Sequence, residues 1–180
     1  MKKLISIQHI IFLLLLTPVI YSQELPIDFS DPSHQFNNDR GTSAEFNLIT
    51  DPNDSTNDVA EIISSTAYSE VFGLTLSTFI DVTDTSNNSI SFDYYATSTG
   101  VRSGSLVLDD EQFGELPIRV SFTTSGTIGW ETITVDFDDA VHFYHTVGTP
   151  VTLSNYGKLT LILSNGSPPF VSTCYIDNIR

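Results

Sequence analysis

Apolar and polar side chains alternate along most of the chain with a period of two residues. In the segment Trp130–Phe137, the apolar residues Ile133, Val135 and Phe137 alternate with polar residues. This period places apolar side chains on one face of a β-strand. A single strand of this kind needs flanking strands and an opposing sheet to bury that face. We therefore take this segment as the centre of the domain, and we expect the final run, Ser172–Ile179, to pair with it.

The same alternation, bounded by turn-forming residues, predicts further short strands along the chain. The segment Asp51–Asp58 is crowded with Asp, Asn, Ser and Pro and is predicted to form a polar turn. No stretch shows convincing helical amphipathicity. About ten short strands separated by turns indicate an all-β fold, namely a two-sheet antiparallel β-sandwich of the jelly-roll type. The other predicted strands are Leu25–Phe29, Phe46–Thr50, Val59–Ser64, Phe72–Phe79, Ser89–Ala96, Ser105–Asp109, Ile118–Thr124 and a strand containing Leu159, Leu161 and Leu163.

The first residues have the pattern of a secretory signal peptide. Lys2 and Lys3 form a positive start, Ile10–Leu16 is apolar, and Ser22 is a small residue at a plausible cleavage point. The apolar run is too short to span a membrane comfortably, which favours cleavage over a membrane anchor. We therefore expect a signal peptide at residues 1–22 and one β-sandwich domain at residues 23–180. The product is expected to be secreted, outside the cell or at its surface, with no membrane contact after cleavage.

Charge and cysteine content narrow the range of functions. The net charge of the 180-residue chain is −15 at pH 7, and loss of Lys2 and Lys3 with the signal peptide would lower it to −17. A negative field of this size repels nucleic acid and anionic membranes, and it argues more weakly against sulfated or uronate-rich glycans. Cys174 is the single cysteine, so no internal disulfide is expected. It shares a strand face with Ile176, which predicts a buried, unreactive thiol.

Candidate binding residues are aromatic or charged, and signatures of catalysis are largely missing. The sequence contains no G-x-S-x-G elbow, no Gly-rich phosphate loop and no H-E-x-x-H motif. By alternation, Tyr95 and Arg119 point away from the core, and they would share an outer face if their strands lay in one sheet. Aromatic rings offer flat surfaces to the apolar C–H faces of sugars. Tyr95, Arg119, Phe72 and Trp130 are therefore the candidate carbohydrate-binding residues, with core packing as the alternative for each ring.

Two carboxylates suggest a structural calcium ion. Asp28 lies on the first predicted strand and Asp177 on the last, so the two would converge if those strands pair. Calcium prefers hard oxygen ligands, which carboxylates and backbone carbonyls supply. Asp28 and Asp177 are therefore the candidate Ca²⁺ ligands.

Four ordered segments carry a family resemblance. They are LPIDFSD at Leu25–Asp31, ITDPNDSTNDVAEI at Ile49–Ile62, GWETITVDFD at Gly129–Asp138 and YIDNI at Tyr175–Ile179. With these segments the chain resembles the jelly-roll, galactose-binding-like carbohydrate-binding domains of secreted polysaccharide-degrading proteins, including the laminarinase-associated type. Each segment is weak evidence alone, and their order and spacing make the set more specific.

The resemblance implies a β-sandwich, a structural calcium near the first and last strands, and glycan binding without catalysis. The chain departs from the group at two positions. Ser30 stands where the group often has an acidic residue, and this departure counts against the calcium site. Phe72 stands where the group often has Trp, and this departure weakens an expected position for stacking on a sugar.

The expected function is a secreted, non-catalytic carbohydrate-binding module for a β-glucan-like polysaccharide. It would act as a monomer or as part of a larger multidomain protein. Two alternatives stay open: a small jelly-roll polysaccharide lyase or hydrolase, and a structural or adhesion domain without a glycan site. Release of reducing ends from a polysaccharide panel would identify an enzyme, and affinity electrophoresis would separate a binding module from a structural domain.

Overall fold

The computed structural model describes residues 25–38, 44–65, 69–109, 116–144, 151–164 and 172–180. The predicted signal peptide, residues 1–22, lies outside these ranges. In the described residues, no helix has the length and apolar character needed to cross a membrane. Within the described ranges, the one short helix is the 3-10 turn η1 (Phe137–Asp139). The strands are β1 (Asn37–Asn38), β2 (Glu45–Asp51), β3 (Asp54–Ile63), β4 (Ser69–Asp81), β5 (Ser89–Ala96), β6 (Ser103–Asp109), β7 (Ile118–Thr123), β8 (Gly129–Asp136), β9 (Val141–His142), β10 (Asn155–Ser164) and β11 (Thr173–Asp177).

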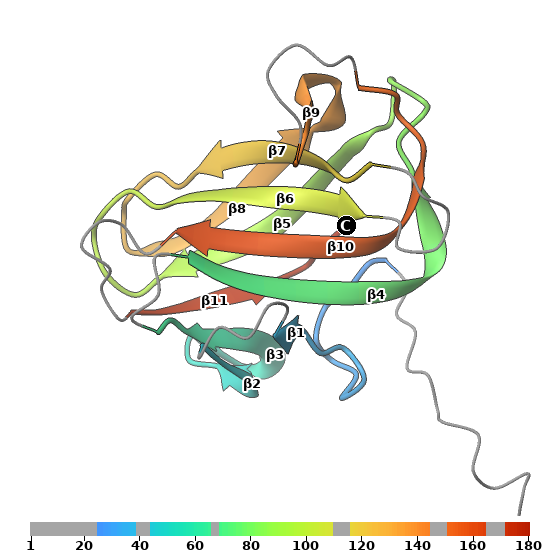
Figure 1. The fold of residues 1–180 in the computed structure, drawn as a ribbon. Helices are drawn as coiled ribbons and strands as arrows, with labels where there is room; N and C mark the ends of the chain where they lie inside the picture. Colours follow the sequence, from blue (N-terminus) through green and yellow to red (C-terminus); the bar gives the residue numbers. More distant parts are fainter. Residues whose placement is uncertain (1–24, 39–43, 66–68, 110–115, 145–150, 165–171) are drawn as a thin grey trace, which may run out of the picture.

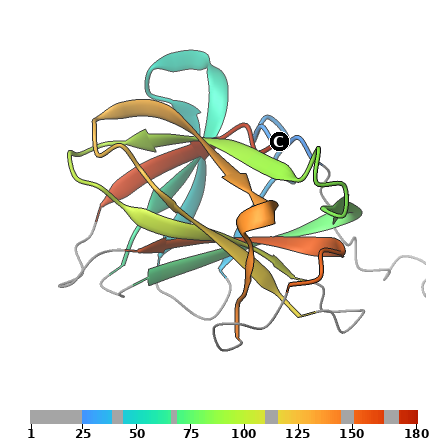
Figure 2. The ribbon, with the colours of Figure 1, turned by 90° about the horizontal axis from the view of Figure 1, so that it is seen from above.

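The strands form two antiparallel sheets that lie face to face (Figures 1 and 2). One sheet has six strands in the order β1-β4-β10-β6-β7-β9, and the other has five in the order β2-β3-β11-β5-β8. Every named pair of neighbouring strands is antiparallel. The predicted all-β, two-sheet sandwich is confirmed.

Strand β5 shows how the sequence pattern produces this arrangement. Ile90, Phe92 and Tyr94 are buried against the opposite sheet, while the residues between them are partly exposed. In β8, Ile133 and Val135 are buried in the same way. Because successive side chains of a strand point to opposite faces, β5 and β8 each place one apolar row in the core and one polar or aromatic row outside.

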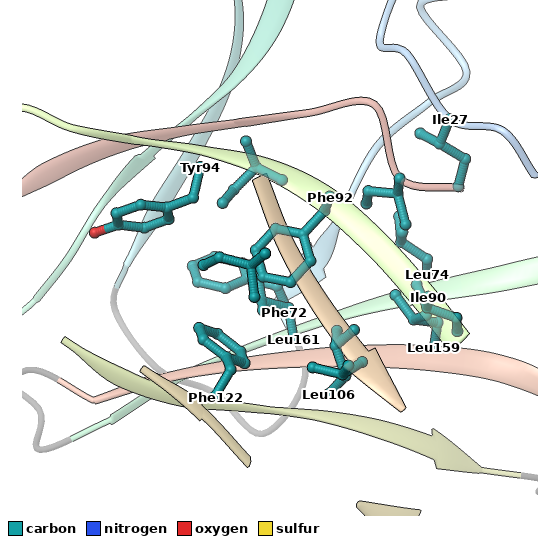
Figure 3. Packing of buried hydrophobic residues seen from close by; sticks show 14 of the residues in the cluster. Ile27, Phe72, Leu74, Ile90, Phe92, Tyr94, Leu106, Phe122, Leu159 and Leu161 are labelled. Carbon is teal, nitrogen blue, oxygen red and sulfur yellow. The ribbon is translucent and has the colours of Figure 1, made fainter. Parts of the chain in front are cut away.

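The core contains apolar side chains from both sheets (Figure 3). Phe92 of β5 and Phe122 of β7 meet with their ring centroids 5.2 Å apart and their planes at 73°. Phe72 of β4 is fully buried, and its ring centroid lies 5.9 Å from that of Phe36. Burying one such ring fully contributes about 1.5–3 kcal/mol to stability, so the contact between the two sheets carries much of the folding free energy.

The hairpin of β2 and β3 is tighter than predicted. Residues Asp51–Asp58 were expected to form one polar turn, but β3 begins at Asp54. The Asp51 carboxylate accepts a hydrogen bond from the Asn53 backbone N–H at 2.8 Å, and the Asp54 carboxylate accepts one from the Thr56 N–H at 2.9 Å. Because each carboxylate satisfies a backbone donor two residues ahead, the polar side chains stabilise a short turn and the start of a strand.

The ends of the chain pair differently from the expectation. The segment Leu25–Phe29 was predicted to be a strand, but it makes only an isolated bridge in which Ile27 and Ile179 exchange hydrogen bonds of 2.8 and 2.9 Å. The predicted direct pairing of Trp130–Phe137 with Ser172–Ile179 is wrong, because β5 lies between β8 and β11. The two strands nevertheless belong to the same sheet.

The single cysteine is buried, as predicted. Cys174 of β11 forms no disulfide and is fully inaccessible to solvent, as is Ile176 on the same face of the strand. Burial raises the pKa of its thiol to about 11. The thiolate is therefore scarce at neutral pH, and the side chain serves as core packing.

Candidate functional site

Three aromatic side chains form a row across the outer face of the five-stranded sheet. In the pairing of β11 with β5, Tyr175 lies opposite Tyr95, and in the pairing of β5 with β8, Tyr95 lies opposite Trp130. Residues directly opposite each other in antiparallel strands share a face. The ring centroids of Tyr95 and Tyr175 are 5.5 Å apart, and those of Tyr95 and Trp130 are 5.3 Å apart. We call Tyr175, Tyr95 and Trp130 the aromatic row.

The rings of the aromatic row do not lie in one plane. The planes of Tyr95 and Tyr175 differ by 33°, whereas Trp130 stands at 67° to Tyr95. Trp130 is 37% exposed, and both tyrosines are partly exposed. The two tyrosine rings are thus tilted only moderately against each other, and the indole stands edge-to-face with Tyr95. This arrangement presents apolar ring faces with hydroxyl and indole N–H groups at their margins.

Polar side chains continue the row toward the edge of the sheet. Glu61 of β3 lies opposite Tyr175, and Asn47 of β2 lies opposite Glu61. The Asn47 side-chain amide donates a 3.0 Å hydrogen bond to the Glu61 carboxylate. Burial and the nearby Glu61 carboxylate raise the pKa of Tyr175. Its hydroxyl group therefore keeps its proton at neutral pH and can donate a hydrogen bond.

A groove of about 300 Å³ adjoins the aromatic row at Trp130. It extends from β8 over β5 and β11 to the β2–β3 hairpin, which projects away from the six-stranded sheet (Figure 2). Its size is at the lower end of the range of small-molecule sites in proteins. Its lining residues are Asp51, Asn57, Asp93, Trp130, Glu131, Thr132, Asp177 and Asn178.

Hydrogen bonds fix the carboxylates of the groove. The Thr132 hydroxyl donates to Asp93 Oδ1 at 2.6 Å, and the Asn178 side-chain amide donates to Asp93 Oδ2 at 3.0 Å. The same Asn178 nitrogen lies 3.2 Å from Asp177 Oδ2, which also accepts a 2.8 Å hydrogen bond from the Asn57 amide. One amide therefore bridges two carboxylates, which holds both side chains in place before any ligand arrives.

Asp177 is the most enclosed acid of the groove at 3% exposure. Burial raises the pKa of its carboxyl group, although the hydrogen bonds from Asn57 and the Asn178 backbone N–H oppose this shift. Asn178 follows with φ of +50°, in the left-handed region that Asn tolerates better than most residues. The backbone N–H of Asn178 donates a 2.7 Å hydrogen bond to Asp177 Oδ1, in addition to the bonds of its side-chain amide.

The structure brings two of the four predicted binding residues together. Tyr95 and Trp130 are neighbours in the aromatic row. Phe72 of β4 is fully buried in the core, so its prediction as a binding residue is wrong. Arg119 points away from the core and is partly buried, but it lies on β7 of the six-stranded sheet, with its guanidinium carbon 5.7 Å from the centre of the Phe143 ring. Tyr95 and Arg119 were expected to share an outer face if their strands lay in one sheet, and this condition is not met, because β5 and β7 belong to different sheets.

The candidate calcium ligands lie on adjoining segments, since Ile27 pairs with Ile179. The Asp28 carboxylate accepts hydrogen bonds from the Ser30 N–H and hydroxyl at 3.1 and 2.8 Å, and these bonds lower the pKa of Asp28. The part of the chain that the structure describes has no group of three or more His, Cys, Asp or Glu able to hold a metal ion. Calcium takes six to eight oxygen ligands, so Asp28 and Asp177 would need backbone carbonyls or water beside them. The calcium site stays a prediction.

Sequence reasoning missed Tyr175, Asp93 and Asn178. A signal for Tyr175 was present, because it alternates with the buried Cys174 and Ile176 and so had to leave the core. Its position beside Tyr95 depends on the pairing of β11 with β5, which no local pattern specifies.

Comparison with known proteins supports the fold. No protein-family model and no curated protein matches the sequence. Among solved structures, the chain is similar to the family 11 carbohydrate-binding module from Clostridium thermocellum in complex with a β-1,3-1,4-mixed-linked tetrasaccharide, with a TM-score of 0.54, 13% identity, and coverage of 81% of this chain and 85% of that one. It is also similar to a non-crystalline cellulose-specific module, CBM28, with a TM-score of 0.57, 13% identity, and coverage of 88% and 94%.

An exo-β-agarase matches over 88% of this chain and 25% of its own, with a TM-score of 0.55 and 15% identity. The fold thus also forms part of a longer enzyme. At these identities the likeness concerns the fold alone, and the chain has the jelly-roll sandwich architecture of these carbohydrate-binding modules.

Proposed function

We propose that the chain is a carbohydrate-binding module and that the aromatic row with its groove is the glycan site. The observation that carries this proposal is the row itself: Tyr175, Tyr95 and Trp130 on three adjacent strands of one outer face. Neighbouring strands are about 4.8 Å apart, which is close to the length of one pyranose unit. A chain running across the strands would therefore place successive sugar rings over successive aromatic rings.

The polar part of the site fits the same ligand class. Sugars present apolar C–H faces and a rim of hydroxyl groups. The aromatic row supplies surfaces for the C–H faces, and the carboxylates and amides of the groove supply hydrogen-bond partners for the hydroxyl groups. Because Asp93 and Asn178 are already held by neighbours, little side-chain entropy would be lost when a glycan binds.

The finer proposal is that the ligand is a β-glucan-like polysaccharide and that it is bound without cleavage. The similar folds include modules described with a mixed-linked β-glucan tetrasaccharide and with non-crystalline cellulose, which supports this choice of ligand. It also agrees with the sequence resemblance to laminarinase-associated domains.

Intrinsic fluorescence gives a direct test, because Trp130 is the only tryptophan of the chain and borders the groove. We expect laminarin, mixed-linked β-glucan or hydroxyethyl-cellulose to change Trp130 emission with a saturable titration curve. Affinity electrophoresis on the same panel should show matching retardation. The absence of both effects across the panel would refute glycan binding at this site.

The enzyme alternative needs its own measurement. Incubation of the protein with each bound polysaccharide should release no reducing ends above the level of a heat-denatured sample. Sustained release would show that the chain is a lyase or hydrolase instead of a binding module.

A further inference from the structure

The charged side chains that line the groove beside the aromatic row are all acidic. Among its described lining residues, four are acidic and none is Lys, Arg or His. The Arg180 guanidinium lies 3.6 Å from Asp93 Oδ2 and donates a 3.0 Å hydrogen bond to the Asn178 carbonyl, but Arg180 does not line the groove. The acidic residues are Asp51, Asp93, Glu131 and Asp177.

Asp93 is the acid best placed to meet a ligand on the aromatic row. It precedes Tyr95 by two residues on β5, on the same face, at a separation of roughly 7 Å along the strand. Its side chain is 23% exposed, whereas Asp177 is 3% exposed overall. Thr132 and Asn178 each donate one hydrogen bond, to different oxygens of the Asp93 carboxylate.

The chemistry of this carboxylate decides what it can recognise. An ionised carboxylate only accepts hydrogen bonds, and its two oxygens have about four lone-pair sites. Thr132, Asn178 and the Arg180 ion pair leave part of this acceptor capacity free, and a sugar hydroxyl can fill it as a donor. A uronate carboxylate or a sulfate ester has no proton to donate and adds like charge. Resting on the proposed function, we propose that Asp93 makes this site selective for neutral glycans and excludes sugars that carry carboxylate or sulfate groups near the Tyr95 position.

The net negative charge of the chain offers a competing explanation, and ionic strength separates the two. At 1 M salt the Debye length is about 3 Å, so long-range repulsion of an anionic polymer is largely screened. A contact between Asp93 and an anionic sugar substituent occurs at shorter range and persists. Selectivity that comes from Asp93 therefore survives high salt, and selectivity that comes from net charge does not.

The experiment compares matched polymers by affinity electrophoresis and Trp130 fluorescence at 0.05 M and 1 M NaCl. The pairs are laminarin with sulfated laminarin, and hydroxyethyl-cellulose with carboxymethyl-cellulose. Because juxtaposed like charges in an interface cost several kcal/mol, we expect the wild type to prefer the neutral polymer by at least about tenfold at both salt concentrations. Asp93→Asn removes the charge with little change in shape and should reduce this ratio about tenfold at 1 M NaCl. Asp139→Asn makes the same change at an exposed residue outside the groove and should leave the ratio unchanged.

The outcomes distinguish this inference from the function on which it rests. A wild type that binds neither neutral polymer overturns both. A wild type that binds the neutral polymers but loses its selectivity at 1 M NaCl overturns the role of Asp93 and leaves the proposed function standing. This comparison uses the wild-type protein only. The role of Asp93 is also overturned if Asp93→Asn and Asp139→Asn show equal ratios of affinity for the neutral and the anionic polymer, with melting temperatures near that of the wild type.

Discussion

Replacing Tyr95 by Ala tests the centre of the aromatic row. Tyr95 contacts both Trp130 and Tyr175, and each aromatic pair contributes about 0.5–1.5 kcal/mol to stability. The substitution should therefore destabilise the fold by about 1–3 kcal/mol, or a melting temperature lower by roughly 2–12 °C for a domain of this size. An aromatic ring stacked on a sugar is worth about 1–2 kcal/mol by analogy with such pairs, so the dissociation constant should rise about 5- to 30-fold.

The assay is titration of Trp130 fluorescence with the best polysaccharide of the panel, alongside thermal unfolding. Tyr95→Phe keeps the ring and should bind within about threefold of the wild type, since it loses at most one hydrogen bond of modest net value. Phe79→Ala is the matched control, because Phe79 is a 52% exposed aromatic residue on β4 of the other sheet. If folded Tyr95→Ala binds at full strength, the aromatic row is not the site. If Phe79→Ala is the variant that loses binding, the ligand contacts the six-stranded sheet.

Three further measurements address the rest of the molecule. Urea unfolding should show that the free energy of unfolding falls as the pH drops below about 4, because turn hydrogen bonds lower the pKa of exposed aspartates such as Asp54 and Asp81 in the folded state. Their contribution to stability is present above the pKa of the unfolded state and is lost as the pH falls through the pKa of the folded state. A free energy of unfolding that stays constant down to pH 2 would contradict this. Gly104→Ala should destabilise the fold by about 1–3 kcal/mol, because the added Cβ would meet the Phe122 ring and lie 2.6 Å from the Ile162 carbonyl oxygen. Glycan binding should not change. A melting temperature equal to that of the wild type would show that the core around Gly104 rearranges to accept the methyl group. For the predicted calcium site, added calcium should raise the melting temperature by mass action, and Asp177→Ala should abolish the increase; identical melting with chelator and with excess calcium would exclude the site.

The fold class followed from local pattern because a period of two and frequent turns leave few alternatives to a sandwich. The same pattern separates inward from outward residues. It assigned Tyr95 to the outside and Phe92 to the core, and both assignments are confirmed. It does not say which sheet a strand joins, because both sheets offer identical backbone partners. For this reason Arg119 could be placed outward correctly and still be placed on the wrong face.

The groove was less predictable than the aromatic row. Its acids come from segments far apart in the chain: Asp51 from the β2–β3 hairpin, Asp93 from β5 and Asp177 from β11. In an acidic chain, each looks like an ordinary solvent-exposed residue. Asp177 alternates with Tyr175 on the outer face, yet it is buried because neighbouring side chains surround it. Burial of this kind depends on tertiary packing, which a single strand does not encode.

The position of β11 also has a consequence for how the chain must fold during synthesis. β11 (Thr173–Asp177) is the central strand of its sheet, between β3 and β5, and β10 (Asn155–Ser164) likewise joins β4 to β6 in the other sheet. Neither sheet can be completed until these late segments have left the ribosome, although the pairs β2–β3, β5–β8 and β6–β7 can form before them. Pairings over such sequence distances are slow to form, and the acidic, turn-rich segments between the early strands would keep the waiting chain from aggregating. Nascent chains arrested before β10 should accordingly remain open to proteases throughout, and release of the full chain should produce resistance in one step.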